Sequence, residues 1–324
     1  MRRKGVVIGL LTLLAVSCQD GSPLQPRSSG RPYEVLLVGD RDSVVYRLLD
    51  RDVAGLPQPE PSFDLSEVSP ERFGQAGQLA RAVVMLEIDD RQYTQPAVRY
   101  EKNTYARPQL IIHLRTPSLQ AVSQRSERLG TALREMLNRY ELDVAVASLK
   151  KAHRTQAEAI IRERFGVRML IPADMTSMKQ GRDFLWLSNN AATGMQNLCV
   201  YRLPERSGGT ITGTERLAAW RDSVMRRNIP GERSGMYMQT VGGSLTQERE
   251  VTRGLWEMRG DAMGGPFVAR CFPRGDSLLV VEAFVYAPEM RKRNRLRALE
   301  AVLYTPTPSF SYNSLLAPVT LRLC

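Results

Sequence analysis

Residues 266–286, with the sequence PFVARCFPRGDSLLVVEAFVY, consist of two apolar arms joined by a turn sequence. The arms are Phe267–Phe272 and Leu278–Tyr286, and the residues Pro273–Ser277 between them include Pro, Gly and Asp, which favour tight turns. Because apolar residues dominate both arms, we expect both strands to be buried. The stretch therefore predicts a hairpin at the centre of a sheet.

Apolar runs outside the hairpin predict further strands and helices. The strongest strand signals before it are Glu34–Asp40, Arg81–Ile88 and Gln109–Leu114. An apolar helical face follows Thr116-Pro117, with Thr116 expected as the helix cap. Groups of strands that are followed by helices are typical of α+β proteins. We therefore predict an α+β fold with mixed, mainly antiparallel sheets covered by helices.

The two parts of the chain share one local pattern. A strand, a proline and a helix follow one another at Ile111–Pro117 and again at Val280–Pro288, so two similar α/β halves are one option and unrelated halves the other. We predict a first α+β half over 32–165 and a second over 166–304. The residues 305–324 are rich in Pro, Ser and Thr, and we expect them to form a loosely packed tail.

The N-terminus has the layout of a signal peptide. A basic stretch at residues 2–4 precedes an apolar run, and small residues stand just before Cys18. A signal that ends on cysteine is similar to that of bacterial lipoproteins, in which the thiol carries lipid. Residues 1–17 would then be the signal peptide and Cys18 the lipidated N-terminus, whereas ordinary cleavage to a secreted protein is the alternative.

The polar residues 18–31 predict a flexible tether between the lipid and a fold that begins near Arg31. We therefore expect a protein of the cell envelope, anchored to a membrane through its lipid and facing the periplasm or the surface. The outer membrane is favoured over the inner one.

The composition argues against a wholly disordered chain and suggests the charge of its partners. Hydrophobic residues make up 43% of the 324 residues and charged residues 24%, which is enough apolar content for a packed core. The formal net charge of +11 suggests anionic partners. Because an exported protein does not meet nucleic acid routinely, an anionic envelope glycolipid or an envelope protein is the expected partner.

Motifs in a fixed order carry a resemblance to a known family. They are PQPEPSFD at Pro57–Asp64, RGLWE at Arg253–Glu257, MGGPFV at Met263–Val268 and FVYAP at Phe284–Pro288. Over about residues 32–304, the chain resembles a family of Bacteroidota lipoproteins that is known only as a domain of unknown function. The resemblance implies a lipid-anchored envelope protein and no particular activity.

Known catalytic motifs are almost absent from the sequence. There is no GxSxG, GxGxxG or P-loop motif, and Ser148-Leu149-Lys150-Lys151 matches S-x-x-K without its partner motifs. The two histidines, His113 and His153, are far apart and there is no CxxC, so we expect no metal and no cofactor. The catalytic residues, if any exist, stay unknown.

The cysteines after Cys18 are Cys199, Cys271 and Cys324, which permit one disulfide without identifying it.

The segment Arg253–Phe267 is the candidate functional surface. On a strand, Arg253 and Glu257 share one face and Trp256 lies on the other, while Gly264 and Gly265 permit close approach of a ligand or another chain. The alternative is that Trp256 anchors the core, the charges form ion pairs and the glycines only make a turn.

The Pro-rich segment with Glu60 and Asp64 is expected to pack near this surface, because an extended loop needs a groove. The basic cluster Arg291–Arg297 either is a solvated helix face or contacts acidic head groups. We favour a non-catalytic binding or structural component of the envelope over an enzyme. A hydrolase that uses carboxylates such as Glu60, Asp64 or Glu257, and an assembly or chaperone-like accessory, are the alternatives.

Overall fold

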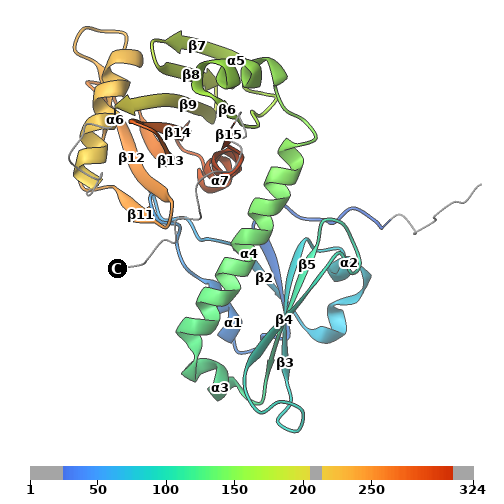
Figure 1. The fold of residues 1–324 in the computed structure, drawn as a ribbon. Coiled ribbons are helices and arrows are strands. Elements are labelled where there is room, and N and C mark those ends of the chain that lie inside the picture. The colour runs from blue at the N-terminus through green and yellow to red at the C-terminus, as the bar shows by residue number, and fades with distance from the viewer. Residues whose placement is uncertain (1–24, 205–213, 309–324) are drawn as a thin grey trace, which may run out of the picture.

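A computed structural model of the chain describes residues 25–204 and 214–308. In these residues the chain forms two domains, and the long helix α4 (Ser126–Leu149) extends from the first toward the second (Figure 1). The predicted α+β class is confirmed. The predicted signal peptide, Cys18 and the residues 309–324 lie outside the described residues.

The first domain is built on a five-stranded mixed sheet with the order β2-β1-β3-β5-β4. Three of its neighbouring pairs are parallel, and β4 runs antiparallel to β5. Helices α1, α3 and α4 cover one face, and Phe73, at the start of α2, packs on the other. The strands are β1 (Glu34–Val38), β2 (Asp64–Val68), β3 (Ala82–Ile88), β4 (Ala97–Lys102) and β5 (Leu110–Thr116), and the short helices are α1 (Val44–Leu49), η1 (Pro70–Arg72), α2 (Gly74–Gln78) and α3 (Leu119–Gln124).

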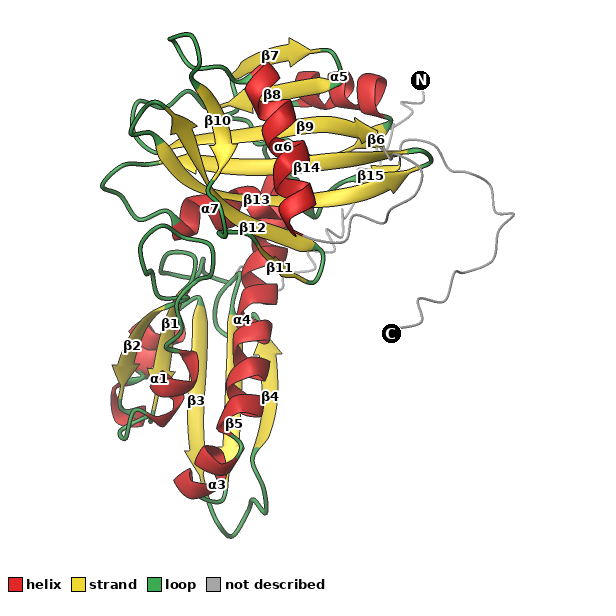
Figure 2. Ribbon diagram, turned by 90° about the vertical axis from the view of Figure 1, so that its left-hand side faces the viewer, coloured by secondary structure: helices red, strands yellow, loops and turns green. Residues whose placement is uncertain are grey.

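The second domain is built on an antiparallel sheet that curls around its helices, with the order β10-β12-β13-β14-β9-β8-β7 and with β11 beside β12. Helices α5 and α7 cover one face and α6 crosses the other (Figure 2). The elements are α5 (Thr155–Phe165), β6 (Val167–Arg168), β7 (Ser177–Gly181), β8 (Phe184–Ser188), β9 (Met195–Pro204), α6 (Thr214–Asn228), β10 (Tyr237–Thr240), β11 (Thr246–Glu248), β12 (Val251–Arg259), β13 (Gly264–Arg274), β14 (Ser277–Tyr286), α7 (Arg293–Leu303) and β15 (Thr307–Pro308).

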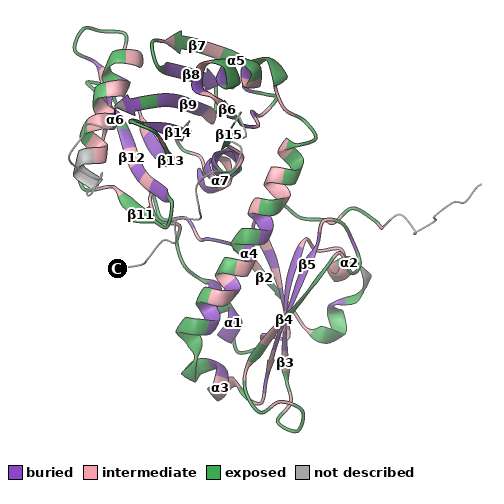
Figure 3. Ribbon diagram, viewed as in Figure 1, coloured by how far each residue is buried: buried purple, intermediate pink, exposed green. Residues whose placement is uncertain are grey.

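The predicted hairpin is confirmed as the centre of this second sheet. Strands β13 and β14 pair from Phe267 opposite Phe284 to Arg274 opposite Ser277, and β12 and β9 flank them. Val280 is completely buried. Figure 3 shows this burial along β9, β13 and β14. The two halves do not share a sheet topology, since among the described residues the strands pair in parallel in the first half alone.

Helix α4 is fixed to the first domain by a buried ion pair. Arg81, just before β3, donates from Nη2 and Nε to the Glu141 carboxylate at 2.7 and 2.8 Å, and the Tyr140 hydroxyl donates to the Arg81 carbonyl at 3.1 Å. The C-terminal part of α4 packs against α7 of the second domain. Because both ends of α4 are held, the helix connects the two domains.

Several local features differ from expectation. Ser118 rather than Thr116 caps α3, since the Ser118 hydroxyl accepts from the Ala121 amide while Thr116 still belongs to β5. Backbone contacts begin before Arg31, because the Ser28 amide donates to the Arg107 carbonyl. Helix α5 packs into the core of the second sheet, although the predicted boundary at 165 groups it with the first half. At the start of the predicted tail, β15 pairs with β6.

Candidate functional site

Strand β12 carries the centre of the candidate surface, and its side chains alternate as predicted. Gly254 and Trp256 are buried beneath α6, whereas Arg253 and Leu255 are half-buried on the opposite face and Glu257 is exposed there. The strand therefore presents Arg253 and Glu257 toward the side of the sheet on which α7 lies.

Trp256 is a core anchor, and Gly265 is the residue that makes room for it. The two residues lie opposite each other in the pairing of β12 with β13. The indole packs edge-on against Phe284, with ring centroids 5.4 Å apart, and its Nε1 donates to the Val285 carbonyl at 3.3 Å. A Cβ on Gly265 would overlap that carbonyl oxygen. Gly265 permits a close approach, as predicted, but the groups that lie against it are Trp256 and Val285 of the same chain.

We expect Gly265→Ala to lower the free energy of unfolding by about 1–3 kcal/mol, as overpacking of a close-packed core does. Gly242→Ala is the matched control, because a Cβ there meets no atom within 4 Å. Urea unfolding of both variants measures the difference. Equal stability of the two variants would contradict the packing role of Gly265.

Arg253 is bound within the fold rather than free on a surface. Its Nη2 donates to the Glu300 Oε1 of α7 at 2.6 Å, and the two side chains are 14% and 11% exposed. Burial alone lowers the pKa of Arg253, but the Glu300 carboxylate raises it above its ordinary value. Arg253 does not pair with Glu257, which accepts from the Gln239 amide at 2.7 Å.

Glu60 joins the Pro-rich loop of the first domain to the second domain. Its two carboxylate oxygens accept from the backbone amides of Lys292 and Arg293 at 2.7 and 3.0 Å, and the residue is buried. These amides form the N-terminus of α7, where a carboxylate satisfies unpaired donors and the helix dipole favours its negative charge. Glu60 thus caps a helix that lies 232 residues away in the sequence.

Asp64 belongs to the same contact between the two domains, which we call the junction: Gln58, Glu60 and Asp64 on one side, and Arg291, Lys292 and Arg293 on the other. One of its oxygens accepts from Arg293 at 2.6 Å and the other from Arg291 at 3.1 Å, and the Lys292 ammonium donates to the Gln58 side chain at 3.1 Å. Arg297 lies 4.2 Å above the ring of Tyr33, whose pKa burial raises to about 12. Much of the basic cluster therefore binds the first domain and is not a solvated face.

A cleft of about 400 Å³ opens beside the junction, and the candidate residues of β12 and β13 line it. Pro57 and Gln58 come from the loop, so the predicted proximity of this loop to the candidate surface is confirmed. Neither Glu60 nor Asp64 lines the cleft. The lining residues are Pro57, Gln58, Val241, Leu255, Trp256, Glu257, Asp261, Ala262, Met263, Gly264, Gly265, Tyr286, Pro288, Glu289 and Lys292.

The charge of the cleft is negative, although the chain is basic. Glu257, Asp261 and Glu289 are exposed, and no lysine or arginine in residues 25–204 and 214–308 forms an ion pair with them. Among the described residues, Lys292 is the one basic residue that lines the cleft, and its ammonium already donates to Gln58 and to the Met290 carbonyl. The cleft can therefore accept a cation.

A buried polar network that the sequence did not predict lies under α6. Arg221 reaches the Glu282 carboxylate at 2.8 Å, the Tyr201 hydroxyl donates to Glu282 at 3.0 Å, and the guanidinium lies 4.0 Å above the Phe267 ring. Both charged side chains are almost completely buried. The signal was a lone Glu282 in an otherwise apolar strand, which requires a partner.

The cysteines beside this network are free thiols. Cys199 and Cys271 form no disulfide, and Cys324 lies outside the described residues. Burial raises the pKa of Cys271 to about 11 and that of Cys199 well above its usual value. Since the thiolate is the reactive form, neither thiol is activated as a nucleophile.

Two further observations bear on ligands. Within the described ranges, no group of three or more His, Cys, Asp or Glu side chains is placed to hold a metal ion. His113 contacts Glu87 in the first domain and His153 contacts Glu158 at the second. The helices of residues 25–204 and 214–308 include none with the length and hydrophobicity that a membrane span requires.

Comparison with known proteins gives two family matches. Residues 28–150 match a domain of unknown function (DUF8532), and residues 154–305 match another domain of unknown function (DUF4837). No curated protein matches the chain. Among solved structures, the chain is similar to the Ran-binding protein Mog1p of Saccharomyces cerevisiae, with 9% identity and a TM-score of 0.31 over 44% of this chain and 90% of that one.

Proposed function

We propose that this chain, whose two halves belong to families of domains of unknown function, is a lipid-anchored, non-catalytic envelope protein that binds a basic segment of another envelope protein in its interdomain cleft. The anchor is Cys18, and the outer membrane is the proposed location. The acidic cleft beside the junction is the observation that carries the binding proposal.

The charge of the cleft supports a cationic partner. Glu257, Asp261 and Glu289 have no basic counterion among the described residues, so a lysine or arginine brought to the cleft would gain attraction without displacing another cation. An anionic glycolipid would instead meet like charge. The protein partner is therefore favoured at this surface over the glycolipid.

The contacts of the other two carboxylates support a non-catalytic role. Both oxygens of Glu60 accept backbone hydrogen bonds, and both oxygens of Asp64 accept from arginines. A glycoside hydrolase needs two carboxyl groups that face one cleft. Of the three proposed carboxylates, only Glu257 lines the cleft. The contacts of Glu60 and Asp64 therefore argue against a hydrolase that uses these two carboxylates together with Glu257.

The anchor is tested by metabolic labelling with an alkyne fatty acid. The charged, apolar and small residues that precede Cys18 lead us to expect label on the wild-type chain and none on Cys18→Ala. Equal labelling of both proteins would contradict lipidation at this residue.

The cleft is tested by photo-crosslinking in cells, with a photoreactive phenylalanine analogue in place of Gln58. We expect one discrete adduct with a protein, and we expect Glu257→Gln with Asp261→Asn to reduce its yield about tenfold, as loss of charge-assisted contacts does. A probe in place of Lys102, which is exposed in the first domain, is the control and should give no such adduct. An adduct that survives neutralisation of both carboxylates would contradict the proposal.

A further inference from the structure

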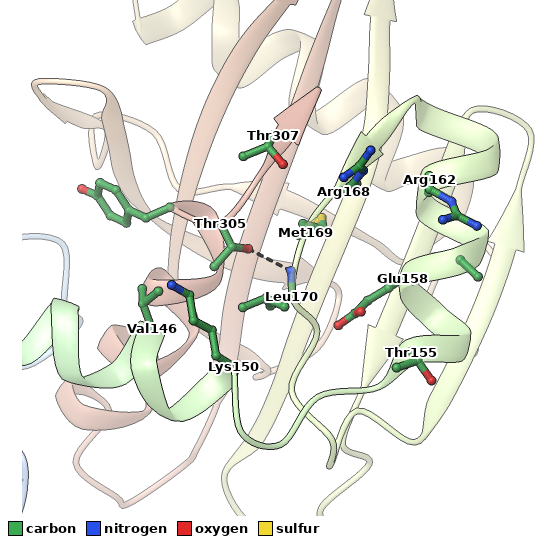
Figure 4. Close-up of a pocket in the computed structure, with 12 residues that line it drawn as sticks. Val146, Lys150, Thr155, Glu158, Arg162, Arg168, Met169, Leu170, Thr305 and Thr307 are labelled. Atoms are coloured by element: carbon green, nitrogen blue, oxygen red, sulfur yellow. Dashed lines mark hydrogen bonds between the residues drawn. The ribbon is translucent and has the colours of Figure 1, made fainter. Parts of the chain in front are cut away.

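A second pocket shares no lining residue with the junction cleft. It has a volume of about 680 Å³ and lies between the last turns of α4, helix α5 and the paired strands β6 and β15. Figure 4 shows Lys150, just after the last residue of α4, opposite Glu158 and Arg162 on α5, with Leu170 and Thr305 between them. The Leu170 amide donates to the Thr305 hydroxyl at 3.0 Å, which joins the two segments at its base. The volume is typical of small-molecule sites.

The rim of this pocket is positively charged. Lys150, Arg162 and Arg168 are exposed, and Glu158 alone is acidic among the described residues that line it. Glu158 is already engaged, because its Oε1 contacts His153 Nδ1 at 2.8 Å and accepts from the Ile171 amide at 3.0 Å. Across residues 25–204 and 214–308, the side chains of Lys150 and Arg162 form no ion pair or side-chain hydrogen bond.

The wall of the pocket is apolar. Val146 and Ala159 face it from the two helices, and Met169 and Leu170 form the side opposite the rim, with Met169 fully buried. An apolar wall below two unpaired cations fits a molecule with a single hydrocarbon chain and an anionic head, because the chain leaves water and the head meets the cations.

We propose that this pocket binds a single-chain anionic amphiphile whose head is a carboxylate or a phosphate. Its chain lies against Val146, Ala159 and Leu170, and its head lies between Lys150 and Arg162. The two head groups share one recognition chemistry, so the experiment distinguishes them by competition. The site is separate from the acidic cleft and does not depend on the partner proposed there.

The test uses a dodecanoate that carries a photoreactive group at the end of its chain. The protein is expressed from the full-length sequence and placed in phosphatidylcholine vesicles, and the labelled peptides are mapped. We expect label within residues 146–170, and competition by unlabelled dodecanoate or dodecyl phosphate; the stronger competitor identifies the head group. Dodecanol and inorganic phosphate should not compete at the same concentration.

Variants decide whether the rim and the wall bind the probe. Lys150→Glu with Arg162→Glu should lower labelling about tenfold or more, since each reversal removes a charge-assisted contact and adds repulsion. Ala159→Trp should block labelling by filling the pocket. Arg128→Glu, an exposed change on the same helix α4, should leave labelling unchanged. Circular dichroism establishes that each variant is folded.

Three results would overturn the proposal. They are labelling that persists in both folded pocket variants, equal competition by dodecanol, and label confined to peptides outside the pocket. The same labelling is measured on a variant that lacks residues 309–324. Labelling that arises only after this removal would mean that the chain itself fills the pocket, and would also contradict a free amphiphile as its occupant.

Discussion

Glu282→Ala is expected to destabilise the second domain by roughly 3–5 kcal/mol, because it leaves the buried Arg221 guanidinium without its counterion. Glu282 is completely buried and accepts from both Arg221 and Tyr201. Burial alone lowers the pKa of Arg221, but the Glu282 carboxylate raises it above its ordinary value, so the arginine stays charged. A charge that is unpaired in the core costs far more than one at the surface.

Urea unfolding measures this loss, and Glu289→Ala is the control because it removes an exposed carboxylate. The double variant Arg221→Met with Glu282→Leu should recover most of the stability, since an apolar pair can replace a buried ion pair. If Glu282→Ala unfolded like Glu289→Ala, the network under α6 would not contribute to the fold as described.

Val280→Asp is expected to prevent the second domain from folding. Val280 is fully buried in the centre of the sheet, opposite Cys271 on β13 and Tyr201 on β9. Burying an unpaired carboxylate costs several kcal/mol, which is comparable with the total stability of a domain. The expected result is loss of the cooperative thermal transition of this domain.

The same change at an exposed edge provides the comparison. Thr246→Asp places a carboxylate on β11, where the side chain is exposed, and should change stability by about 0.5 kcal/mol or less. A cooperative melt of Val280→Asp near that of wild type would contradict the central position of β14.

Features that depend on local sequence were predictable. The apolar arms around Pro273–Ser277 predicted the β13–β14 hairpin, and the alternation around Trp256 predicted which side chains of β12 are buried. Both follow from the two-residue period of a strand, which a short stretch of sequence contains. The packing role of Gly265 was one of two options, and only the position of Val285 decides between them.

Features that depend on distant partners were not predictable from single residues. Glu60 and Asp64 look like free carboxylates in the sequence, yet their partners are Lys292, Arg293 and Arg291 at the start of α7. The pairing of Arg221 with Glu282 depends likewise on where α6 crosses the sheet. Thr116 was expected as a helix cap because Pro follows it, but β5 extends through Thr116 and the helix starts after Ser118.

The carboxylates at the junction stabilise it, and we propose that those in the cleft bind a partner. A comparison of Glu60→Gln with Glu257→Gln separates these two roles, if both the melting temperature and the yield of the photo-crosslink from position 58 are measured. We expect Glu60→Gln to lower the melting temperature, because a buried cap of α7 loses its charge. We expect Glu257→Gln to melt like wild type and to lower the yield of the crosslink, by less than the double variant with Asp261→Asn. If Glu257→Gln kept the full crosslink, or if Glu60→Gln melted like wild type, the account would be contradicted.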